Sequence, residues 1–345
     1  MSRLLHFFGR RAFKARLPGL LEFATLALLL WCMSVEAVTQ LGEKQEPTLD
    51  RLLPDVARQM AFNKDGTKLI AKGMGGTVVE WDIATRQKRE VTNINAKRWF
   101  AYAVGTNQLL VREADDDIVL LSIASGEETR LTNGEYESGD ISADGTLAVL
   151  TNGDDSVEVW QIQPDAVQKL KTLETAFPVR NGVAISAAGD AIAAAEGTYH
   201  EEHRTVIEVW YPAQESPARR INTGTILGVW NLLFSPDGTM LAVDSQHQAQ
   251  SGIRVWEVET GRHLLSRDGF EAYWTRALAF SPTSDILASG DEGGNFVLWD
   301  IRADDAVWRE TYPTGIQSIA FSPNGESVAI ALWDTTIQLQ HWRKQ

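Results

Sequence analysis

Two short polar stretches contain the side-chain types that bind metal ions. Residues 200–203, His-Glu-Glu-His, combine the imidazole and carboxylate groups that zinc prefers. Residues 115–117 are three aspartates, whose carboxylates are typical calcium ligands. In an extended chain His200 and His203 lie roughly 10 Å apart on opposite faces, so only a turn would bring them together. We therefore expect a solvated loop at 200–203, a plain acidic turn at 115–117, and no metal site.

The rest of the chain contains no recognisable catalytic or cofactor-binding motif. It has no glycine-rich phosphate loop, no Gly-x-Ser-x-Gly elbow, no His-Glu-x-x-His and no Cys-x-x-Cys-His. Cys32 is the only cysteine, which excludes an intramolecular disulfide and a zinc–thiolate site. The sequence therefore predicts a protein without catalytic residues and without a cofactor.

The composition is that of a globular protein with a strong acidic balance. Hydrophobic residues make up 44% of the chain, and the formal net charge is −14. Because attraction to phosphate needs clustered lysine and arginine, this balance argues against nucleic acid as a partner.

One unit of sequence recurs along the chain and predicts its architecture. The unit is an apolar run, a tight turn, a second apolar run, a polar turn, and alternating apolar residues that end at tryptophan or leucine. Pro-Asp-Gly or Asp-Gly in the tight turn supplies the reversal between two strands. The clearest copies begin at Asn231, Ala277 and Ser318. The seven closing residues are Trp81, Leu121, Trp160, Trp210, Trp256, Trp299 and Leu339.

The spacing of these closing residues identifies the repeat. They follow one another at intervals of 39 to 50 residues, the period of a four-stranded propeller blade. Alternate residues of a strand point to opposite faces. The closing tryptophans are therefore expected to pack between neighbouring blades and not to contact a ligand.

The repeated motif resembles that of the WD40 family. Phe-Ser-Pro stands at 234–236, 280–282 and 321–323, and the Trp-Asp pair remains at 81–82 and 299–300. The resemblance covers residues 49–342 and implies an all-β, seven-bladed β-propeller of four-stranded antiparallel blades, here built from residues 48–345. No Gly-His pair precedes the first strands, so the Asp-His-Ser-Trp hydrogen-bond network of strong WD40 blades is expected to be absent. The motif is also similar to TolB-like and lactonase-like propellers.

The resemblance implies a function but leaves alternatives open. A WD40-like propeller is expected to be a non-catalytic scaffold that mediates protein–protein interaction, with a protein or peptide partner whose identity the sequence does not give. A lactonase-like hydrolytic propeller would need a metal or an acid/base set at the central channel, and no such set is recognisable. An accessory subunit of a membrane complex, attached through a single N-terminal helix, is the other alternative.

The last blade needs a strand from the start of the repeat region. The third strand of the seventh unit ends close to Gln345, and an unpaired strand edge exposes backbone donors and acceptors. Residues 48–53 stand ahead of the first unit and have no other role. We expect them to supply the outer strand of the last blade and to close the ring.

The expected binding surface is one face of the propeller. This face carries the loops between the second and third strand of each blade and the loops that lead into the first strand of the following blade. These loops are rich in aromatic residues, which include Phe177, Tyr199 and Tyr273. Arg58, Arg98 and Arg276 each stand four residues before the large apolar residue near the end of a first strand. Glu137 and Gln317 share that register, which is expected to ring the channel mouth. Trp, Tyr and Arg are enriched at binding hot spots. The predicted partner-binding residues are Arg58, Arg98, Trp99, Tyr136, Asn181, Trp230, Trp274, Arg276, Tyr312 and Trp333.

The first 37 residues differ from the rest of the chain. Five basic residues precede the first acid, Glu22, and an uncharged, mostly apolar run extends from Phe23 to Val35. As a helix this run is roughly 20 Å long, which is short for a membrane span. Together with Val35 and Ala37 it is typical of a secretory signal cleaved after Ala37.

Three other interpretations of this segment remain open. Residues 17–37 form a longer apolar stretch that would serve as an uncleaved membrane anchor. Arg10-Arg11 resembles a twin-arginine export signal, and an arginine-rich, acid-poor start is also typical of a mitochondrial presequence. We expect residues 1–37 to be a signal or anchor helix and residues 38–47 a linker. The body is then expected to be periplasmic or otherwise extracytoplasmic, either secreted or tethered to the membrane.

Overall fold

The computed structural model describes most of the repeat region. The described residues are 48–49, 55–92, 100–113, 115–180, 182–196, 206–211, 213–214, 216–223, 229–245, 252–268 and 274–342. All of them belong to one compact unit, residues 46–345. The expected signal or anchor helix (1–37) and linker (38–47) lie outside the described residues.

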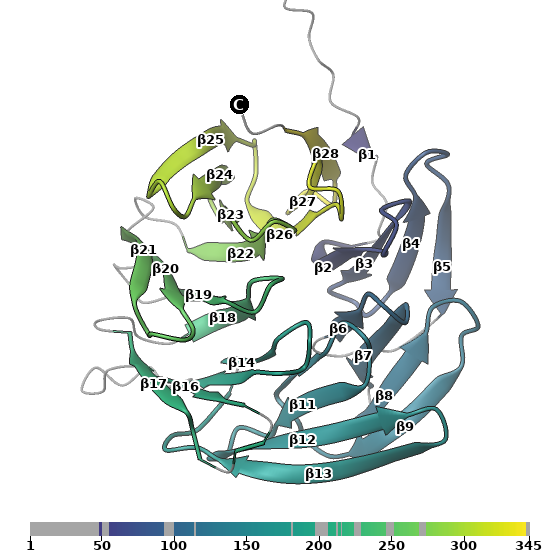
Figure 1. The fold of residues 1–345 in the computed structure, drawn as a ribbon. Coiled ribbons are helices and arrows are strands. Elements are labelled where there is room, and N and C mark those ends of the chain that lie inside the picture. The colour runs from purple at the N-terminus through teal and green to yellow at the C-terminus, as the bar shows by residue number, and fades with distance from the viewer. Residues whose placement is uncertain are drawn as a thin grey trace, which may run out of the picture. The chain divides into compact units, whose positions relative to one another are not determined.

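Within this unit the chain forms seven four-stranded antiparallel sheets, which confirms the predicted all-β propeller of seven blades (Figure 1). Blade 1 contains β2 (Ala57–Phe62), β3 (Lys68–Gly73), β4 (Val78–Asp82) and β5 (Lys88–Thr92). Blade 2 contains β6 (Phe100–Ala103), β7 (Gln108–Arg112), β8 (Asp117–Ser122) and β9 (Glu128–Asn133). Blade 3 contains β10 (Ser138–Ile141), β11 (Leu147–Thr151), β12 (Ser156–Gln163) and β13 (Ala166–Glu174).

The remaining blades repeat this order of strands. Blade 4 contains β14 (Gly182–Ile185), β15 (Ile192–Ala195), β16 (Val206–Trp210) and β17 (Arg219–Asn222). Blade 5 contains β18 (Val229–Phe234), β19 (Met240–Ser245), β20 (Gly252–Glu257) and β21 (His263–Asp268). Blade 6 contains β22 (Thr275–Phe280), β23 (Ile286–Asp291), β24 (Asn295–Asp300) and β25 (Asp305–Thr311). Blade 7 contains β26 (Ile316–Phe321), β27 (Ser327–Leu332), β28 (Ile337–His341) and, as its fourth strand, β1 (Thr48–Leu49).

The turns between first and second strands follow from the Asp-Gly motif. In blade 1 the Asp65 carboxylate accepts hydrogen bonds from the Thr67 backbone N–H at 2.9 Å and from the Thr67 hydroxyl at 2.5 Å. Gly66 between them has φ of 73°, a conformation that glycine adopts without steric cost. Asp144 and Asp237 make the same pair of bonds in blades 3 and 5. In these three blades the motif therefore fixes the point at which the inner strand ends.

The closing tryptophans lie in the third strands, and most of them are core residues as predicted. Trp81 and Trp210 are completely buried, and Trp256 and Trp299 are nearly so. Trp160 differs, since it is half-buried and its indole N–H donates to Glu158 at 3.0 Å.

Blade 6 retains one hydrogen bond of the Asp-His-Ser-Trp network that the sequence was expected to lack. The Trp299 Nε1–H donates to Ser289 Oγ at 2.9 Å. In blades 1 and 4 alanine occupies the position of this serine, at Ala71 and Ala194, as the strand registers show. The buried Nε1–H groups of Trp81 and Trp210 consequently have no hydrogen-bond partner.

The first described strand joins the last blade. β1 pairs antiparallel with β28, Thr48 opposite Gln338 and Leu49 opposite Ile337. Residues 50–53, also expected in this strand, lie outside the described residues. In the same unit β2 of blade 1 lies against β26 of blade 7. Sheet pairing and core contacts thus both connect the first repeat to the last.

Replacing residues 48–53 with a Gly-Ser sequence of equal length is expected to lower the melting temperature by about 4 °C. Roughly two backbone hydrogen bonds would be lost, each contributing about 1 kcal/mol, and 1 kcal/mol shifts the midpoint by about 2 °C in a domain of this size. The exposed β28 edge should also favour self-association. Scanning calorimetry of the full chain measures this effect, with the same replacement at 40–45 as control. Equal melting temperatures for the two variants would show that β1 does not stabilise the ring.

Candidate functional site

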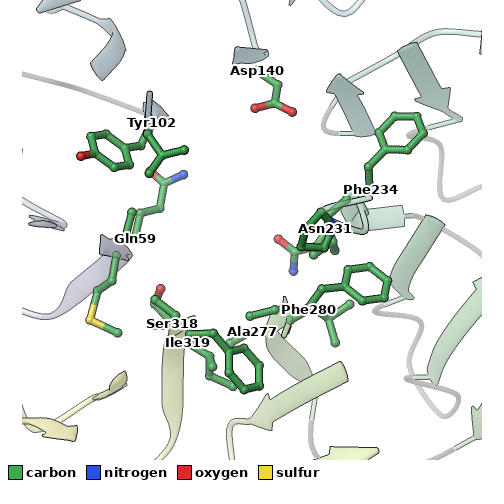
Figure 2. Close-up of a pocket in the computed structure, with 18 of the residues that line it drawn as sticks. Gln59, Tyr102, Asp140, Asn231, Phe234, Ala277, Phe280, Ser318 and Ile319 are labelled. Atoms are coloured by element: carbon green, nitrogen blue, oxygen red, sulfur yellow. The ribbon is translucent and has the colours of Figure 1, made fainter. Parts of the chain in front are cut away.

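The inner strands of all seven blades line a central cavity. Its volume is about 570 Å³, and β2, β6, β10, β14, β18, β22 and β26 each contribute residues (Figure 2). Among the described residues that line it, three are charged: Arg58, Asp140 and Arg276. Polar side chains of Gln59, Asn231 and Ser318 accompany them, so the cavity is not a continuation of the apolar core.

Residues of the predicted register do lie together at the end of the cavity where the inner strands begin. Arg58, Arg276 and Gln317 are each the second residue of their strand and line the cavity. We call this end the upper rim. Arg98 and Asn181 lie outside the described residues, and Trp230 is placed in β18 without a described side chain. Glu137 precedes β10 and is half-buried.

Arg276 links the upper rim to an exposed tryptophan. Its guanidinium donates to Glu292 Oε1, with the Nε atom 2.7 Å from that oxygen, and forms an ion pair with the same carboxylate. The guanidinium carbon also lies 5.2 Å from the ring centroid of Trp274, a cation–π contact. Trp274 is 40% exposed. Two neighbours thus hold Arg276 in place beside an accessible aromatic ring.

A second exposed tryptophan adjoins this group. Trp333, in the turn after β27, is 44% exposed, and its backbone N–H donates to Gly315 O at 2.9 Å. A Cβ atom on Gly315 would lie 2.7 Å from the Trp333 ring and 2.6 Å from Glu292 O. Trp333 therefore rests against the backbone beside the ion pair. Trp274, Arg276, Glu292, Gly315 and Trp333 together form what we call the blade 6/7 patch.

A buried carboxylate that the sequence analysis missed lies behind the patch. Asp244 is completely buried and accepts hydrogen bonds from Asn231, 2.7 Å from its backbone N and 2.6 Å from Nδ2. Burial raises the pKa of Asp244 to about 7, although Asn231 and the charge of Arg276 oppose this rise. In the sequence, the one sign of this buried carboxylate is a single acid inside the apolar strand β19. One polar residue does not change the apolar pattern by which a strand is recognised. Asp244 anchors Asn231, which lines the cavity next to Arg276.

Three aromatic residues expected on the binding face belong instead to the core. Tyr136 and Phe177 are buried, and the Tyr136 hydroxyl donates to Glu158 at 2.7 Å. Burial also raises the pKa of Tyr136 to about 12. Tyr312 packs edge-to-face on Phe296 with ring centroids 6.4 Å apart. Trp99, Tyr199 and Tyr273 lie outside the described residues.

The two metal-like stretches give no metal centre among the described residues. Residues 200–203 fall outside them. In the acidic turn, Asp116 forms an ion pair with Arg112, and Asp117 pairs with Arg130 at 2.7 Å. Across the described ranges no group of three or more His, Cys, Asp or Glu side chains could hold a metal ion.

Comparison with known proteins agrees with this architecture. The sequence model of the family "WD domain, G-beta repeat" matches residues 267–300, from β21 to the end of β24. The crystal structure of the Cps50 (Swd1) β-propeller domain from Myceliophteria thermophila superposes with a TM-score of 0.70, covering 86% of this chain and 99% of that one. The chain is a WD40-repeat-like seven-bladed β-propeller. At 15% identity, the structural likeness to Cps50 concerns the fold alone.

Curated relatives of this WD40-like propeller match over part of their length. Eukaryotic translation initiation factor 3 subunit I of Pyricularia oryzae is 31% identical over 93 residues, 27% of this chain and 26% of that protein. Small ribosomal subunit protein RACK1y of Oryza sativa is 26% identical over 112 residues, 31% of this chain and 33% of the relative. WD repeat-containing protein VIP3 of Arabidopsis thaliana is 28% identical over 147 residues, 38% and 44% of the two chains. The matched segments thus span about a quarter to under half of these relatives.

The relatives overturn the predicted location of this WD40-like propeller. A eukaryotic translation initiation factor subunit and a ribosomal subunit protein work inside the cell, so the prediction of a periplasmic or secreted body is wrong. That prediction rested on the basic and apolar composition of residues 1–37, a feature that several kinds of segment share. In the part of the chain that the structure describes, no helix is both long and apolar enough to span a bilayer.

Proposed function

We propose that this WD40-like propeller is a non-catalytic scaffold that binds a protein partner through the blade 6/7 patch. The observation that carries the proposal is the contiguity of Trp274, Arg276 and Trp333 around the Glu292 ion pair. Monomeric proteins rarely expose large apolar side chains that adjoin one another, and exposed aromatic residues beside arginine are typical of binding hot spots. The patch adjoins the upper rim, where Arg58 is also exposed.

The relatives support a role in assembly. Their names describe a subunit of an initiation factor and a protein of the small ribosomal subunit, which are components of multi-protein particles. Arg276 suits such a role because Glu292 and Trp274 already fix its side chain. A side chain that is ordered before binding loses less conformational entropy when it binds. The partner is then a protein whose surface presents an apolar group to the tryptophans and a hydrogen-bond acceptor to Arg276.

Replacing Trp274 and Trp333 together with alanine is expected to reduce partner recovery at least tenfold. Two truncated hot-spot tryptophans cost roughly 2 kcal/mol each, although the two losses need not add. The measurement is quantitative mass spectrometry of proteins captured from native lysate by the tagged full chain. Circular dichroism checks that the double variant remains folded.

Two exposed residues elsewhere provide the matched control. Leu170 on β13 is 47% exposed and Val307 on β25 is 44% exposed, fractions similar to those of the two tryptophans. The double variant Leu170→Ala/Val307→Ala should recover the same partners in the same amounts as the wild type. Recovery that falls equally in both double variants, or in neither, would contradict binding through the blade 6/7 patch.

A further inference from the structure

The described lining of the central cavity contains one carboxylate, that of Asp140 on β10. Figure 2 shows this carboxylate pointing into the cavity. Its Oδ1 atom accepts the Ile141 N–H and its Oδ2 atom accepts the Ile185 N–H of the next blade, both at 2.9 Å. These two bonds fix the direction of the side chain.

The fold does not require an acid at this position. Asp140 immediately precedes the apolar residue that ends its inner strand, and the equivalent residues of the other blades follow from their strand registers. They are Ala61, Ala101, Ala184, Leu233, Ala279 and Ala320. Alanine or leucine therefore serves in the six other blades, and the charge of Asp140 calls for another explanation.

Asp140 has no basic partner within the described part of the chain. Its contacts there are the two backbone N–H groups, and no lysine or arginine side chain pairs with it. Burial raises its pKa to about 6, against the effect of these hydrogen bonds. A partly buried carboxylate without a counter-ion gains free energy when a cation arrives, because the attraction is strong where water is excluded.

The two ends of the cavity differ in charge. The upper rim carries Arg58 and Arg276, whereas the opposite end is lined by uncharged residues, Ala143, Ala187 and Pro236 among them. We call this end the lower rim. Its turns are joined across blades, because Gly105 N donates to Ala143 O at 2.6 Å and Ala143 N donates to Ala187 O at 3.0 Å.

Acids of the turns between first and second strands surround the lower rim. Asp65, Asp144, Asp190 and Asp237 are exposed there, one each in blades 1, 3, 4 and 5. Hydrogen bonds from Thr67 hold the pKa of Asp65 below its usual range, so this carboxylate stays ionised. The field of these groups favours the approach of a cation from the lower side, where the upper-rim arginines do not oppose it.

We propose that the lower end of the channel is a second binding site, which takes a lysine or arginine side chain from a basic segment of a partner protein and pairs it with Asp140. Asp140 stands three residues, about 10 Å of strand, from the upper rim register, so a side chain entering from below meets the carboxylate before the arginines. The acidic net charge of the chain, −14, suits a basic partner. This site is distinct from the blade 6/7 patch, and its test is independent of that patch.

The probe is a fluorescein-labelled nonapeptide, (Gly-Arg-Ser)₃, compared with the same peptide in which citrulline, a neutral isostere, replaces each arginine. Fluorescence anisotropy with the full chain should show saturable binding of the arginine peptide and at least tenfold weaker binding of the citrulline peptide. Asp140→Asn should weaken binding of the arginine peptide at least tenfold. Ala187→Trp, which places a bulky ring at the lower rim, should do the same without altering Asp140.

The control variant removes one negative charge, as Asp140→Asn does, but at a position far from the channel. Glu128, exposed at the start of β9 in the outermost strand of blade 2, takes the Glu128→Gln substitution, and binding should change less than twofold. The wild type should also bind more weakly as the pH falls from 7 to 5, since protonated Asp140 offers no charge, and Asp140→Asn should lose this dependence. Absence of saturable binding by the folded wild type overturns the proposal. So do equal losses in Glu128→Gln and Asp140→Asn, or unchanged binding by Ala187→Trp.

Discussion

Replacing Trp210 with alanine is expected to lower the free energy of unfolding by about 3–5 kcal/mol. Trp210 is completely buried, and its ring lies in a cluster that joins Val149 and Val159 of blade 3 to Ile185 of blade 4. Removing the indole therefore opens a cavity between two blades, which neither sheet can fill by a rotamer change alone. Urea denaturation of the full chain, followed by far-UV circular dichroism, measures the loss.

Phenylalanine variants separate ring volume from hydrogen bonding. Trp210→Phe keeps most of the apolar ring and removes an N–H that has no partner, so it should cost clearly less than Trp210→Ala. Trp299→Phe also keeps a ring but leaves the hydroxyl of Ser289 without its donor. It should therefore cost about 1–2 kcal/mol more than Trp210→Phe. Equal costs at the two positions would mean that the Trp299–Ser289 bond does not stabilise blade 6.

Replacing Gly294 with alanine is expected to cost about 3–5 kcal/mol, which is a large loss for one methyl group. Gly294 lies in the turn before β24 with φ of 84°. A Cβ atom there would lie 2.3 Å from Tyr312 O and 2.7 Å from Thr314 O, both backbone atoms that a side-chain rotation does not move. The turn adjoins Glu292, so we expect the blade 6/7 patch to distort as well. The free energy of unfolding in urea is again the measurement.

Gly238 supplies the matched control for this substitution. It has a similar φ of 72°, but the nearest atom to an added Cβ, Ser186 Cβ, is 3.7 Å away. Gly238→Ala should therefore cost only the left-handed backbone penalty, about 1–2 kcal/mol. A cost as large as that of Gly294→Ala would show that the clash with Tyr312 and Thr314 is not the cause.

The fold could be predicted from sequence because the same pattern of apolar residues and turns occurs once in each blade. Each blade needs an apolar inner strand, a tight turn and an alternating third strand, and seven imperfect copies reinforce one another. Asp65-Gly66 and Trp81 are weak signals alone, yet the same types recur at the same offsets in later blades. The structure places all seven closing residues in third strands for this reason.

The site was predicted less well because it depends on details that do not repeat. Trp274 and Tyr312 both lie between the outer strand of one blade and the inner strand of the next, yet Trp274 is exposed and Tyr312 packs on Phe296. Residue type alone does not separate these outcomes. Asp244 is a single acid in the apolar strand β19, and Asp140 lies in the short strand β10, where the other blades have alanine or leucine. A search for the repeat pattern treats both acids as departures from the consensus. Their roles depend on neighbours that the chain brings together from other strands and blades.

The pairing of β1 with β28 has a consequence for the synthesis of the chain. Thr48 and its partner Gln338 are 290 residues apart, so at a translation rate of 5–20 residues per second β1 waits roughly 15 to 60 s for the strand it joins. During that interval the early blades can form beside the ribosome while the ring remains open. The nascent protein therefore presents an unclosed propeller, the stage at which molecular chaperones would have most surface to protect.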